Sequence, residues 1–271
     1  MMRGVLVLLL LLLGAGCGDT TGFIAGVSLD PRGNVVVAYA GHNLIRVVSP
    51  IDGTELREHR TGVRSPDDVA AGPNGELWWT SLFTGEVGYA DASGKATILA
   101  DPGIGVNAIA LAPDGRLLVS QCFGGDDLLS LDPYVAGEPT RLLEDLGEEC
   151  AINGMKFGKD GWLYGSQPPM GRVVRVNLAD GTLEVLASGL SKQVYAVALT
   201  PEGEVFALDG SRVVRVLAGG AVEPFVELPN VGDNMVFSAD GSELFVSTGA
   251  DMRVLGFDRQ GRQRVLLEGP P

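Results

Sequence analysis

Residues 67–100 read DDVAAGPNGELWWTSLFTGEVGYADASGKATILA and contain four short β-rich runs separated by turns. The runs are DDVAAG (67–72), ELWWTS (76–81), EVGYAD (86–91) and KATILA (95–100). A Pro-Asn-Gly-Glu turn joins the first two runs, and its glycine supplies the positive φ that a tight hairpin needs. Four such runs with short connections predict a four-stranded antiparallel sheet.

The same unit occurs six times along the chain. Its first turn recurs as PRGN (31–34), PNGE (73–76), PDGR (113–116), KDGW (159–162), PEGE (201–204) and ADGS (239–242). The turn glycines are Gly33, Gly75, Gly115, Gly161, Gly203 and Gly241, at spacings of 42, 40, 46, 42 and 38 residues. Four strands in a repeat of about 40 residues are typical of a propeller blade, whereas the repeats of a parallel solenoid are shorter.

We therefore predict an all-β fold, a six-bladed β-propeller with four antiparallel strands per blade, over 23–271. The expected blades span about 23–62, 63–104, 105–148, 149–191, 192–230 and 231–271. The whole chain has 271 residues, of which 39 are glycine, and a net charge of −14. This acidic balance without a basic patch argues against nucleic acid as a partner. We expect a monomer.

The N-terminal sequence MMRGVLVLLLLLLGAGC (1–17) has the features of a secretory signal peptide. Arg3 precedes an apolar run at 5–13, and small residues follow at 14–16. We predict a signal peptide over 1–16. LGAGC resembles a bacterial lipobox, in which the cysteine is diacylated, although an ordinary cleavage site with a nearby Cys17 is the alternative.

On this interpretation, residues 17–22 form a tether with lipid on Cys17, which anchors the protein in a membrane. The protein is then an exported lipoprotein of the bacterial cell envelope, either periplasmic or at the outer surface. Cys122 and Cys150 remain as a pair in an oxidising compartment. We predict a disulfide between them that joins neighbouring blades beside the channel mouth, with two buried thiols as the alternative.

The inner strand of each blade is expected to line a central channel. Counting eight residues back from each turn glycine gives equivalent positions, namely Ala25, Asp67, Asn107, Asn153, Tyr195 and Asp233. Asp and Asn disfavour strands, so four of them at equivalent positions suggest a role. The alternative is that these residues only cap strand ends in a wet channel.

Converging carboxylate and amide oxygens suit a hard cation such as Ca²⁺, with other divalent cations left open. We predict Asp67, Asn107, Asn153 and Asp233 as its ligands, and the catalytic residue stays unknown, with Asp67 or Asp233 as candidate general base. Candidate residues for the wall of a ligand pocket are Gln121, Phe123, Gln167, Tyr195, Asp209 and Asn234.

The segment NGMKFGKDGWLYGS (153–166) resembles the Asn-Gly inner strand of the senescence-marker-protein/gluconolactonase family of six-bladed propellers. The blade pattern is shared with NHL-repeat proteins and virginiamycin B lyase, and GPNGELWWTSLFTGEVG (72–88) is similar to a blade of the lyase. The resemblance implies Ca²⁺-dependent hydrolysis of a lactone or ester, with Asn153 at the metal-binding Asn of the family and Asn107 at the family's Asn one blade earlier.

This chain departs from the family at two positions. Ala25 and Tyr195 stand where the family has a metal-binding Glu and Asp. We therefore expect a degenerate or rearranged metal site, and the alternative function is a non-enzymatic scaffold that binds a small ligand, glycan or protein at the cell envelope. The catalytic histidine of the lyase lies late in its chain, whereas His42 and His59 both fall in the first repeat. Lyase chemistry is therefore not supported, and His59, among charged residues, is expected to be solvated.

Overall fold

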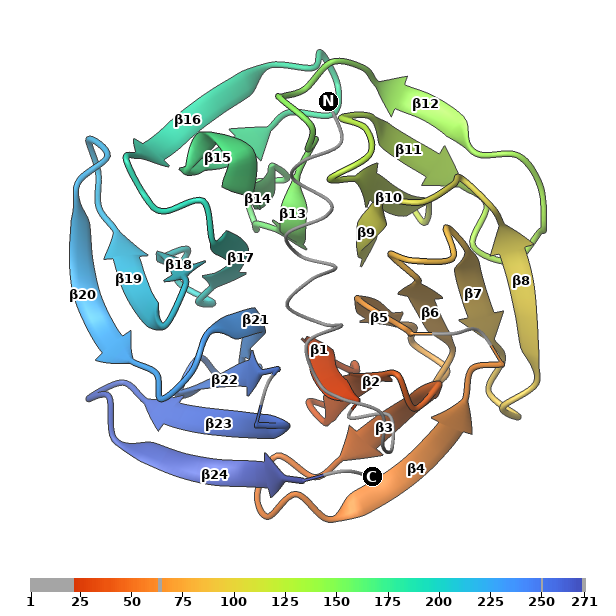
Figure 1. Cartoon of the computed structure of the whole chain (residues 1–271), viewed down its shortest axis with the longest axis horizontal. Helices are drawn as coiled ribbons and strands as arrows, with labels where there is room; N and C mark the ends of the chain where they lie inside the picture. The colour runs from red at the N-terminus through yellow and green to blue at the C-terminus, as the bar shows by residue number, and fades with distance from the viewer. Residues whose placement is uncertain (1–21, 63–64, 250, 270–271) are drawn as a thin grey trace, which may run out of the picture.

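The computed structural model describes residues 22–62, 65–249 and 251–269. The predicted signal peptide and Cys17 therefore lie outside the described residues. Within these segments, the strands form six four-stranded antiparallel sheets arranged in a ring (Figure 1). The fold is a six-bladed β-propeller, which confirms the prediction from the repeats.

Each blade consists of four consecutive strands, numbered outward from the channel. Blade 1 has β1 (Phe23–Leu29), β2 (Val35–Ala40), β3 (Leu44–Val48) and β4 (Glu55–Arg60). Blade 2 has β5 (Val69–Ala71), β6 (Leu77–Thr80), β7 (Val87–Ala90) and β8 (Ala96–Ala100). Blade 3 has β9 (Val106–Leu111), β10 (Leu117–Gln121), β11 (Leu128–Leu131) and β12 (Thr140–Leu143).

The second half of the chain repeats this order. Blade 4 has β13 (Asn153–Phe157), β14 (Leu163–Gln167), β15 (Arg172–Val176) and β16 (Leu183–Ser188). Blade 5 has β17 (Val194–Leu199), β18 (Val205–Asp209), β19 (Arg212–Val216) and β20 (Val222–Glu227). Blade 6 has β21 (Gly232–Phe237), β22 (Glu243–Thr248), β23 (Arg253–Asp258) and β24 (Gln263–Glu268).

Helix in the described segments is confined to one 3₁₀ turn, η1 (Pro168–Met170). No helix in these segments has the length and apolar character needed to cross a bilayer.

The turn between the first and second strand of each blade has the same geometry in all six repeats. Its glycine has a φ of 71° to 94°, a left-handed conformation that other residues rarely adopt. The glycine N–H donates to the carbonyl three residues earlier, as from Gly33 to Asp30 and from Gly75 to Gly72. The local turn chemistry therefore sets the start of every blade.

The hydrophobic core lies between blades and not inside any one of them. The described residues form six buried clusters, and each one joins two neighbouring blades. Trp78 and Trp79 on β6 illustrate the pattern, because successive side chains of a strand point to opposite faces. Trp78 packs in the cluster with blade 3 and Trp79 in the cluster with blade 1, and both are fully buried.

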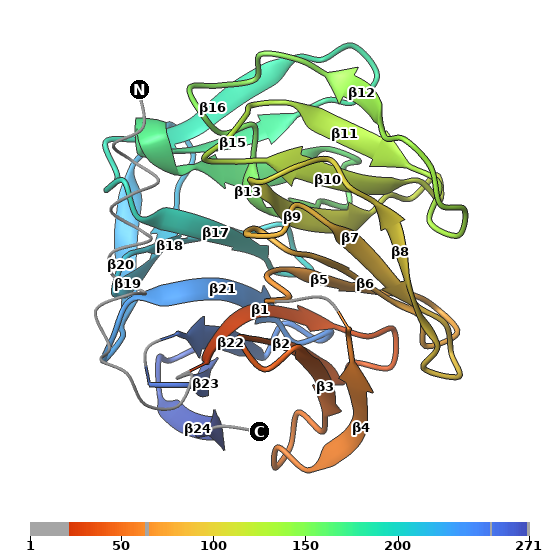
Figure 2. The ribbon, with the colours of Figure 1, turned by 45° about the vertical axis from the view of Figure 1, so that its right-hand side comes forward.

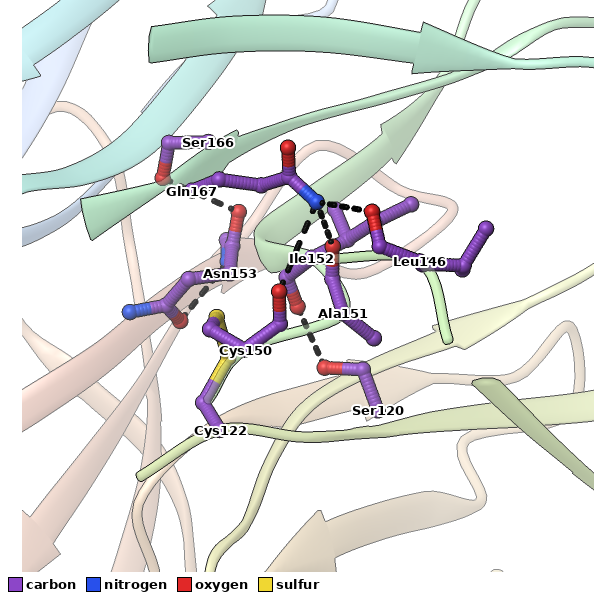
Figure 3. The surroundings of a disulfide bond; sticks show 10 residues. Ser120, Cys122, Leu146, Cys150, Ala151, Ile152, Asn153, Ser166 and Gln167 are labelled. Atoms are coloured by element: carbon purple, nitrogen blue, oxygen red, sulfur yellow. Dashed lines mark hydrogen bonds between the residues drawn. A yellow bond between two sulfur atoms is a disulfide. The ribbon is translucent and has the colours of Figure 1, made fainter. Parts of the chain in front are cut away.

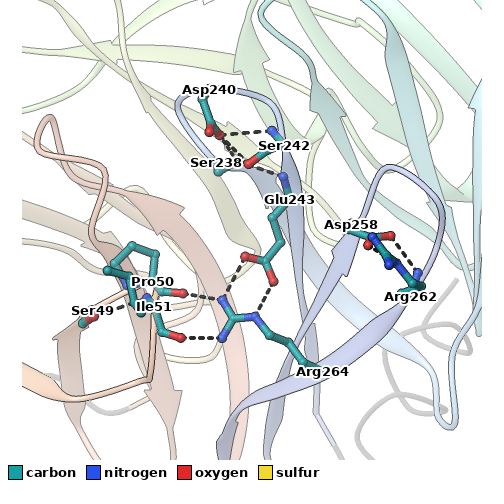
Figure 4. Close-up of polar contacts among 10 residues, drawn as sticks. All are labelled: Ser49, Pro50, Ile51, Ser238, Asp240, Ser242, Glu243, Asp258, Arg262 and Arg264. Carbon is teal, nitrogen blue, oxygen red and sulfur yellow. Dashed lines mark hydrogen bonds and ion pairs between the residues drawn. The ribbon is translucent and has the colours of Figure 1, made fainter.

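The inner strands β17, β21 and β1 run side by side from one face of the ring to the other (Figure 2). The ring closes between blades 6 and 1 without the exchange of a strand, since β1–β4 and β21–β24 each form a complete sheet. On the outer side of this junction, Arg264 donates to the carbonyls of Pro50 and Ile51 while it pairs with Glu243 (Figure 4). On the inner side, the Ser247 hydroxyl donates to the Ala25 carbonyl at 2.6 Å.

Candidate functional site

The channel mouth is the face of the ring at which the six inner strands begin (Figure 1). The six predicted equivalent positions all lie at this end of the channel. Asp67 lies just before β5, and the other five lie within the first three residues of their strands, namely Ala25, Asn107, Asn153, Tyr195 and Asp233. The structure therefore places the four predicted cation ligands at one mouth, on four different blades.

Asp67 and Asp233 form an acidic pair at this mouth. Burial raises the pKa of the Asp67 carboxyl well above its ordinary value, and the charge of Asp233 raises it further. Burial raises the pKa of Asp233 to about 7, and the charge of Asp68 adds to this effect. Blade 1 lies between the two blades and offers only Ala25 and Gly26 at this level. Burial and like charge disfavour the charged forms of this pair, and a cation bound between the carboxyls would favour them.

Asp68 lies next to this pair but is occupied by contacts within the protein. It is 3% exposed and accepts hydrogen bonds from the N–H groups of Val69 and Ile109 at 2.9 and 3.1 Å. The Asn234 amide donates to the same carboxylate at 2.9 Å. Burial raises the pKa of Asp68, while the positive charge of Lys156 acts against this rise. Asp68 and Asn234 thus tie blades 2, 3 and 6 together, and the amide of Asn234, a predicted pocket-wall residue, takes part in this tie.

The tie between Asn234 and Asp68 spans blade 1, where the equivalent residue is Gly26. The Gly26 N–H donates to the Asp67 carbonyl at 2.6 Å. A Cβ at Gly26 would lie 2.5 Å from that carbonyl oxygen and 2.9 Å from Asp68 Cα. Only glycine permits this approach of β1 to β5, and it also removes any side chain between the acidic residues of blades 2 and 6.

Asn107 and Asn153 lie on neighbouring blades, and each is 7% exposed. Asn153 Oδ1 accepts the Gly154 N–H at 2.9 Å, which orients the amide oxygen and leaves it a second lone pair. The Asn107 carbonyl accepts the Thr80 hydroxyl of blade 2, which fixes the backbone at the start of β9. Both side chains are therefore carried on backbone that neighbouring contacts hold in place.

The four residues offer the type of ligand atom, oxygen, that a hard cation prefers. Two carboxylates and two amides provide oxygen atoms, and a cation would favour the charged forms of Asp67 and Asp233 that burial disfavours. Among the described residues, however, no group of three or more His, Cys, Asp or Glu side chains is arranged to hold a metal ion. Water or a ligand would have to complete the coordination shell.

Tyr195 occupies the blade 5 position beside this pair. It is half-buried, and burial raises the pKa of its phenol, with the charge of Asp233 adding to the rise. The phenol therefore stays protonated at neutral pH and supplies a hydrogen-bond donor where the resembling family has a carboxylate.

Two predicted pocket-wall residues lie at the mouth end of the second strand of blade 3 and are half-buried, namely Gln121, which ends β10, and Phe123, two residues later. Phe123 has a φ of 65°, an uncommon conformation for a bulky side chain. Its N–H donates to the Glu149 carbonyl of the segment that leads into blade 4. The neighbouring contact therefore holds Phe123 in this conformation.

Two other predicted wall residues are used inside the protein. Gln167 is fully buried, and its amide donates to the carbonyls of Leu146 and Ala151 at 2.9 and 2.7 Å (Figure 3). Asp209 is 4% exposed and accepts the Ser191 N–H and the Arg212 guanidinium at 2.9 and 2.7 Å. Both side chains hold loops at the mouth, and the position of a residue at a strand end does not reveal in the sequence which way its side chain points.

Cys122 and Cys150 form a disulfide, as predicted, and both residues are fully buried (Figure 3). The bond joins the end of β10 in blade 3 to the segment before β13 in blade 4. The nearby Ser120 hydroxyl donates to the Ile152 carbonyl across the same junction. The backbone before Asn153 is thus fixed covalently to its neighbouring blade.

The expectation that His59 is solvated was wrong. It is 5% exposed and lies against the turn at Gly94 between β7 and β8 of blade 2. Its Nε2 has no hydrogen-bond partner among the described residues. Burial lowers the pKa of the imidazole, with the charge of Arg57 acting in the same direction and that of Asp91 against it.

Two hollows lie away from the mouth. One of about 850 Å³ runs between blades 4 and 5 past Tyr164, Arg175 and Arg215. The other, of about 520 Å³, is lined by the first turns of blades 4, 5 and 6, at the opposite end of the inner strands. The arginines that border the first hollow already pair with carboxylates, Arg175 with Glu184 and Arg215 with Glu204.

The fold and the hub define the protein as a six-bladed propeller with an acidic channel mouth. Solved structures similar to this chain include virginiamycin B lyase from Staphylococcus aureus, at a TM-score of 0.68 and 13% identity over 92% of this chain and 85% of that one. A gluconolactonase from Xanthomonas campestris gives 0.69 and 16% over 85% and 84%. Regucalcin from Agrobacterium tumefaciens, described as calcium-binding, gives 0.64 and 18% over 82% and 81%.

These similarities establish the fold, and it is like that of the gluconolactonase and regucalcin propellers that the sequence resembles. No protein-family model matches the chain. No curated protein matches it either. Function has to be argued from the residues at the mouth.

Proposed function

We propose that the protein binds a cation at the channel mouth, with Asp67 and Asp233 supplying charge and Asn107 and Asn153 supplying amide oxygens. Ca²⁺ is the first candidate, because carboxylate, amide and water oxygens are its usual ligands. The observation that carries the proposal is the acidic pair of blades 2 and 6 at one mouth, where burial raises the pKa of Asp67 and the charge of Asp233 raises it further. A calcium-binding regucalcin among the structural neighbours is consistent with it.

The reaction proposed for this site is hydrolysis of a lactone or related ester. When bound, Ca²⁺ would supply the positive charge that polarises the carbonyl oxygen of the substrate. Asp233 is the proposed general base, because it is a carboxylate at the same mouth and could accept a proton from the attacking water. Tyr195, kept protonated beside it, donates a hydrogen bond to the substrate or to the attacking water.

A specific observation favours a second candidate function, the binding of a ligand without chemical change. Ala25 and Tyr195 remove two carboxylates that the resembling hydrolase family uses. Asp67 and Asp233 lie on different blades from these two positions, so they do not restore the same arrangement of charge. In this case the same mouth binds a small ligand, glycan or protein partner of the cell envelope.

The location proposed for the protein is the bacterial cell envelope, where lipid on Cys17 anchors a monomeric ring to a membrane. The signal-like segment 1–16 and the cysteine that follows it support this proposal. The disulfide between Cys122 and Cys150 is consistent with an oxidising compartment.

Calorimetric titration of Ca²⁺ into the metal-stripped protein spanning 18–271 tests the cation site. We expect micromolar affinity, weakened at least tenfold by Asp233→Asn and by Asn153→Ala, which each remove a proposed ligand. Asp114→Asn is the matched control, because it removes an exposed carboxylate from a turn at the opposite face. Absence of binding at millimolar Ca²⁺, or equal loss in the control variant, would contradict the proposal.

A panel of lactones and esters then separates the two functions. Turnover that is abolished by chelator and by Asp233→Asn supports a hydrolase. Ligand binding without turnover, unaffected by chelator, supports the scaffold.

A further inference from the structure

We infer that the channel mouth faces the membrane, so that ligands reach Asp67 and Asp233 through a narrow gap between the ring and the bilayer. The inference rests on the lipid anchor of the proposed function and is independent of the cation site. It follows from the length of the tether and from the place at which the tether joins the ring.

The tether joins the ring at the channel mouth. Phe23 is the first residue of β1, and β1 is the innermost strand of blade 1 (Figure 1). Six Cα–Cα steps separate Cys17 from Phe23. A fully extended chain covers at most about 3.5 Å per residue, so a lipid on Cys17 lies within about 20 Å of the mouth.

The same length excludes the reverse orientation. β1 has seven residues and runs from the mouth toward the opposite face, which is therefore about 20 Å away from Phe23. The outermost strand of the same blade, β4, lies three strand spacings farther out, at about 14 Å from β1. To place the opposite face on a bilayer, the tether would have to run across the mouth, around the rim and along the full depth of the ring, which exceeds its reach.

The charge of the ring keeps the gap open. With a net charge of −14, the protein has no electrostatic attraction to anionic headgroups, so the lipid alone sets the contact. Acidic residues are also present on the mouth-side loops of blades 3 and 4, where Asp126 and Asp145 are close enough for their charges to repel each other. This side of the ring is held away from an anionic surface, and water and solutes can enter there.

The width of the gap selects the class of ligand. A folded domain of 100 residues has a radius of gyration of about 13 Å and does not fit into a space of about 20 Å. Small solutes fit, and so do amphiphiles whose polar group lies in the headgroup layer. The anchored protein therefore takes a small or membrane-partitioned ligand at Asp67 and Asp233, in preference to a folded protein partner.

Site-directed fluorescence on the full acylated chain tests this orientation. Lys192→Cys places a thiol on the mouth side, in the exposed segment before β17, and Lys159→Cys places one on the opposite face, in the exposed turn between β13 and β14. The two variants change charge equally, and Cys122 and Cys150 do not compete for the label because they are paired. Each labelled protein is reconstituted into phosphatidylcholine–phosphatidylglycerol vesicles that contain a lipid with a nitroxide headgroup.

We expect quenching several-fold stronger at Lys192→Cys than at Lys159→Cys, and no quenching of either label in the soluble form spanning 18–271. Equal quenching, or stronger quenching at Lys159→Cys, would overturn the orientation. A mass spectrum of the mature N-terminal peptide without acyl chains on Cys17 would overturn the anchor itself. Neither result bears on calcium titration of the soluble form, so the two proposals fail separately.

Discussion

Three aspartates lie at the hub, and each is placed in a different environment. Asp68 is hydrogen-bonded on both carboxylate oxygens by blades 2, 3 and 6. Burial instead raises the pKa of both Asp67 and Asp233, and the charge of Asp233 adds to the shift of Asp67. At the level of single residues, Asp68 holds the inner strands together, and the other two carboxylates are the ones available for a ligand.

His59 provides a test at this scale, because its environment disfavours a charge. Its pKa lies below the ordinary value of 6.5 in the folded protein, so the unfolded chain binds the proton more readily. The contribution of neutral, buried His59 to the free energy of unfolding is fully present above pH 6.5. It is lost as the pH falls through that value toward the lower pKa of the folded state.

We therefore expect the urea midpoint of the wild type to fall more between pH 8 and pH 5 than that of His59→Phe, which cannot be protonated. Both proteins contain the same carboxylates, so the difference between their midpoints does not include the effect of protonating Asp and Glu. An equal fall of the midpoint in both proteins would show that protonation of His59 does not destabilise the folded protein.

Some hub residues could be identified from the sequence and others could not. Counting back from the turn glycines located Asp67 and Asp233, because equivalent residues of a repeat occupy equivalent places. The tie from Asn234 to Asp68 could not be anticipated, since it depends on a glycine in the blade between them. Lys156 was also missed, although the equivalent residue five positions before the turn glycine is small or aliphatic in the other blades.

At the level of the strands, hydroxyl groups near the mouth end of the second strands connect neighbouring blades. Each of these hydroxyls donates to a carbonyl in or just before the inner strand of the next blade. The bonds run from Thr80 to Asn107, from Ser120 to Ile152 and from Ser247 to Ala25. The equivalent residues of blades 1 and 5 are Ala38 and Leu208, which carry no hydroxyl. These bonds satisfy backbone groups close to the mouth, where the inner strands begin.

Ser247→Ala tests this connection at the junction of the chain ends. The fully buried Ser247 hydroxyl also accepts the Asn234 N–H at 2.9 Å, so its removal leaves a donor and an acceptor unsatisfied. We expect a loss of about 2 kcal/mol in the free energy of unfolding, measured by urea titration. Ser188→Ala on the exposed end of β16 is the control, and a similar loss there would contradict the interpretation.

The strands themselves were accessible from the sequence because their turns are encoded locally. Each first turn carries a glycine with positive φ and a hydrogen bond over three residues. The direction of side chains at strand ends was not accessible. Gln167 and His59 are both buried against a neighbouring blade, and only the assembled ring shows which side of a strand meets that neighbour.

At the scale of the whole molecule, the junction between blades 6 and 1 is distinct from the other five, since no covalent connection crosses it. Arg264 provides an outer contact there, with a hydrogen bond of 2.9 Å to the Ile51 carbonyl (Figure 4). Arg262 lies two residues earlier and pairs with Asp258 inside its own hairpin. Arg264 therefore makes a contact that closes the ring, whereas Arg262 makes an ion pair within one hairpin at the surface, and the two can be compared.

Arg264→Ala is expected to lower the free energy of unfolding by about 1 kcal/mol, a modest value because the side chain is partly exposed to solvent. Arg262→Ala, its matched control, is expected to change stability by less than about 0.5 kcal/mol. Thermal and urea unfolding of both variants measures the difference. A larger effect of Arg262→Ala would show that this closing contact does not stabilise the ring.

Six complete sheets, each formed by one uninterrupted stretch of chain, also leave the protein free of any obligatory first blade. A circular permutant that joins the present ends and opens between two other blades would keep every strand with its own sheet. The order in which blades leave the ribosome and the place of the ring in a fusion protein are thus separable from its architecture. A blade can be moved from the end of the gene to its beginning without rewriting the fold.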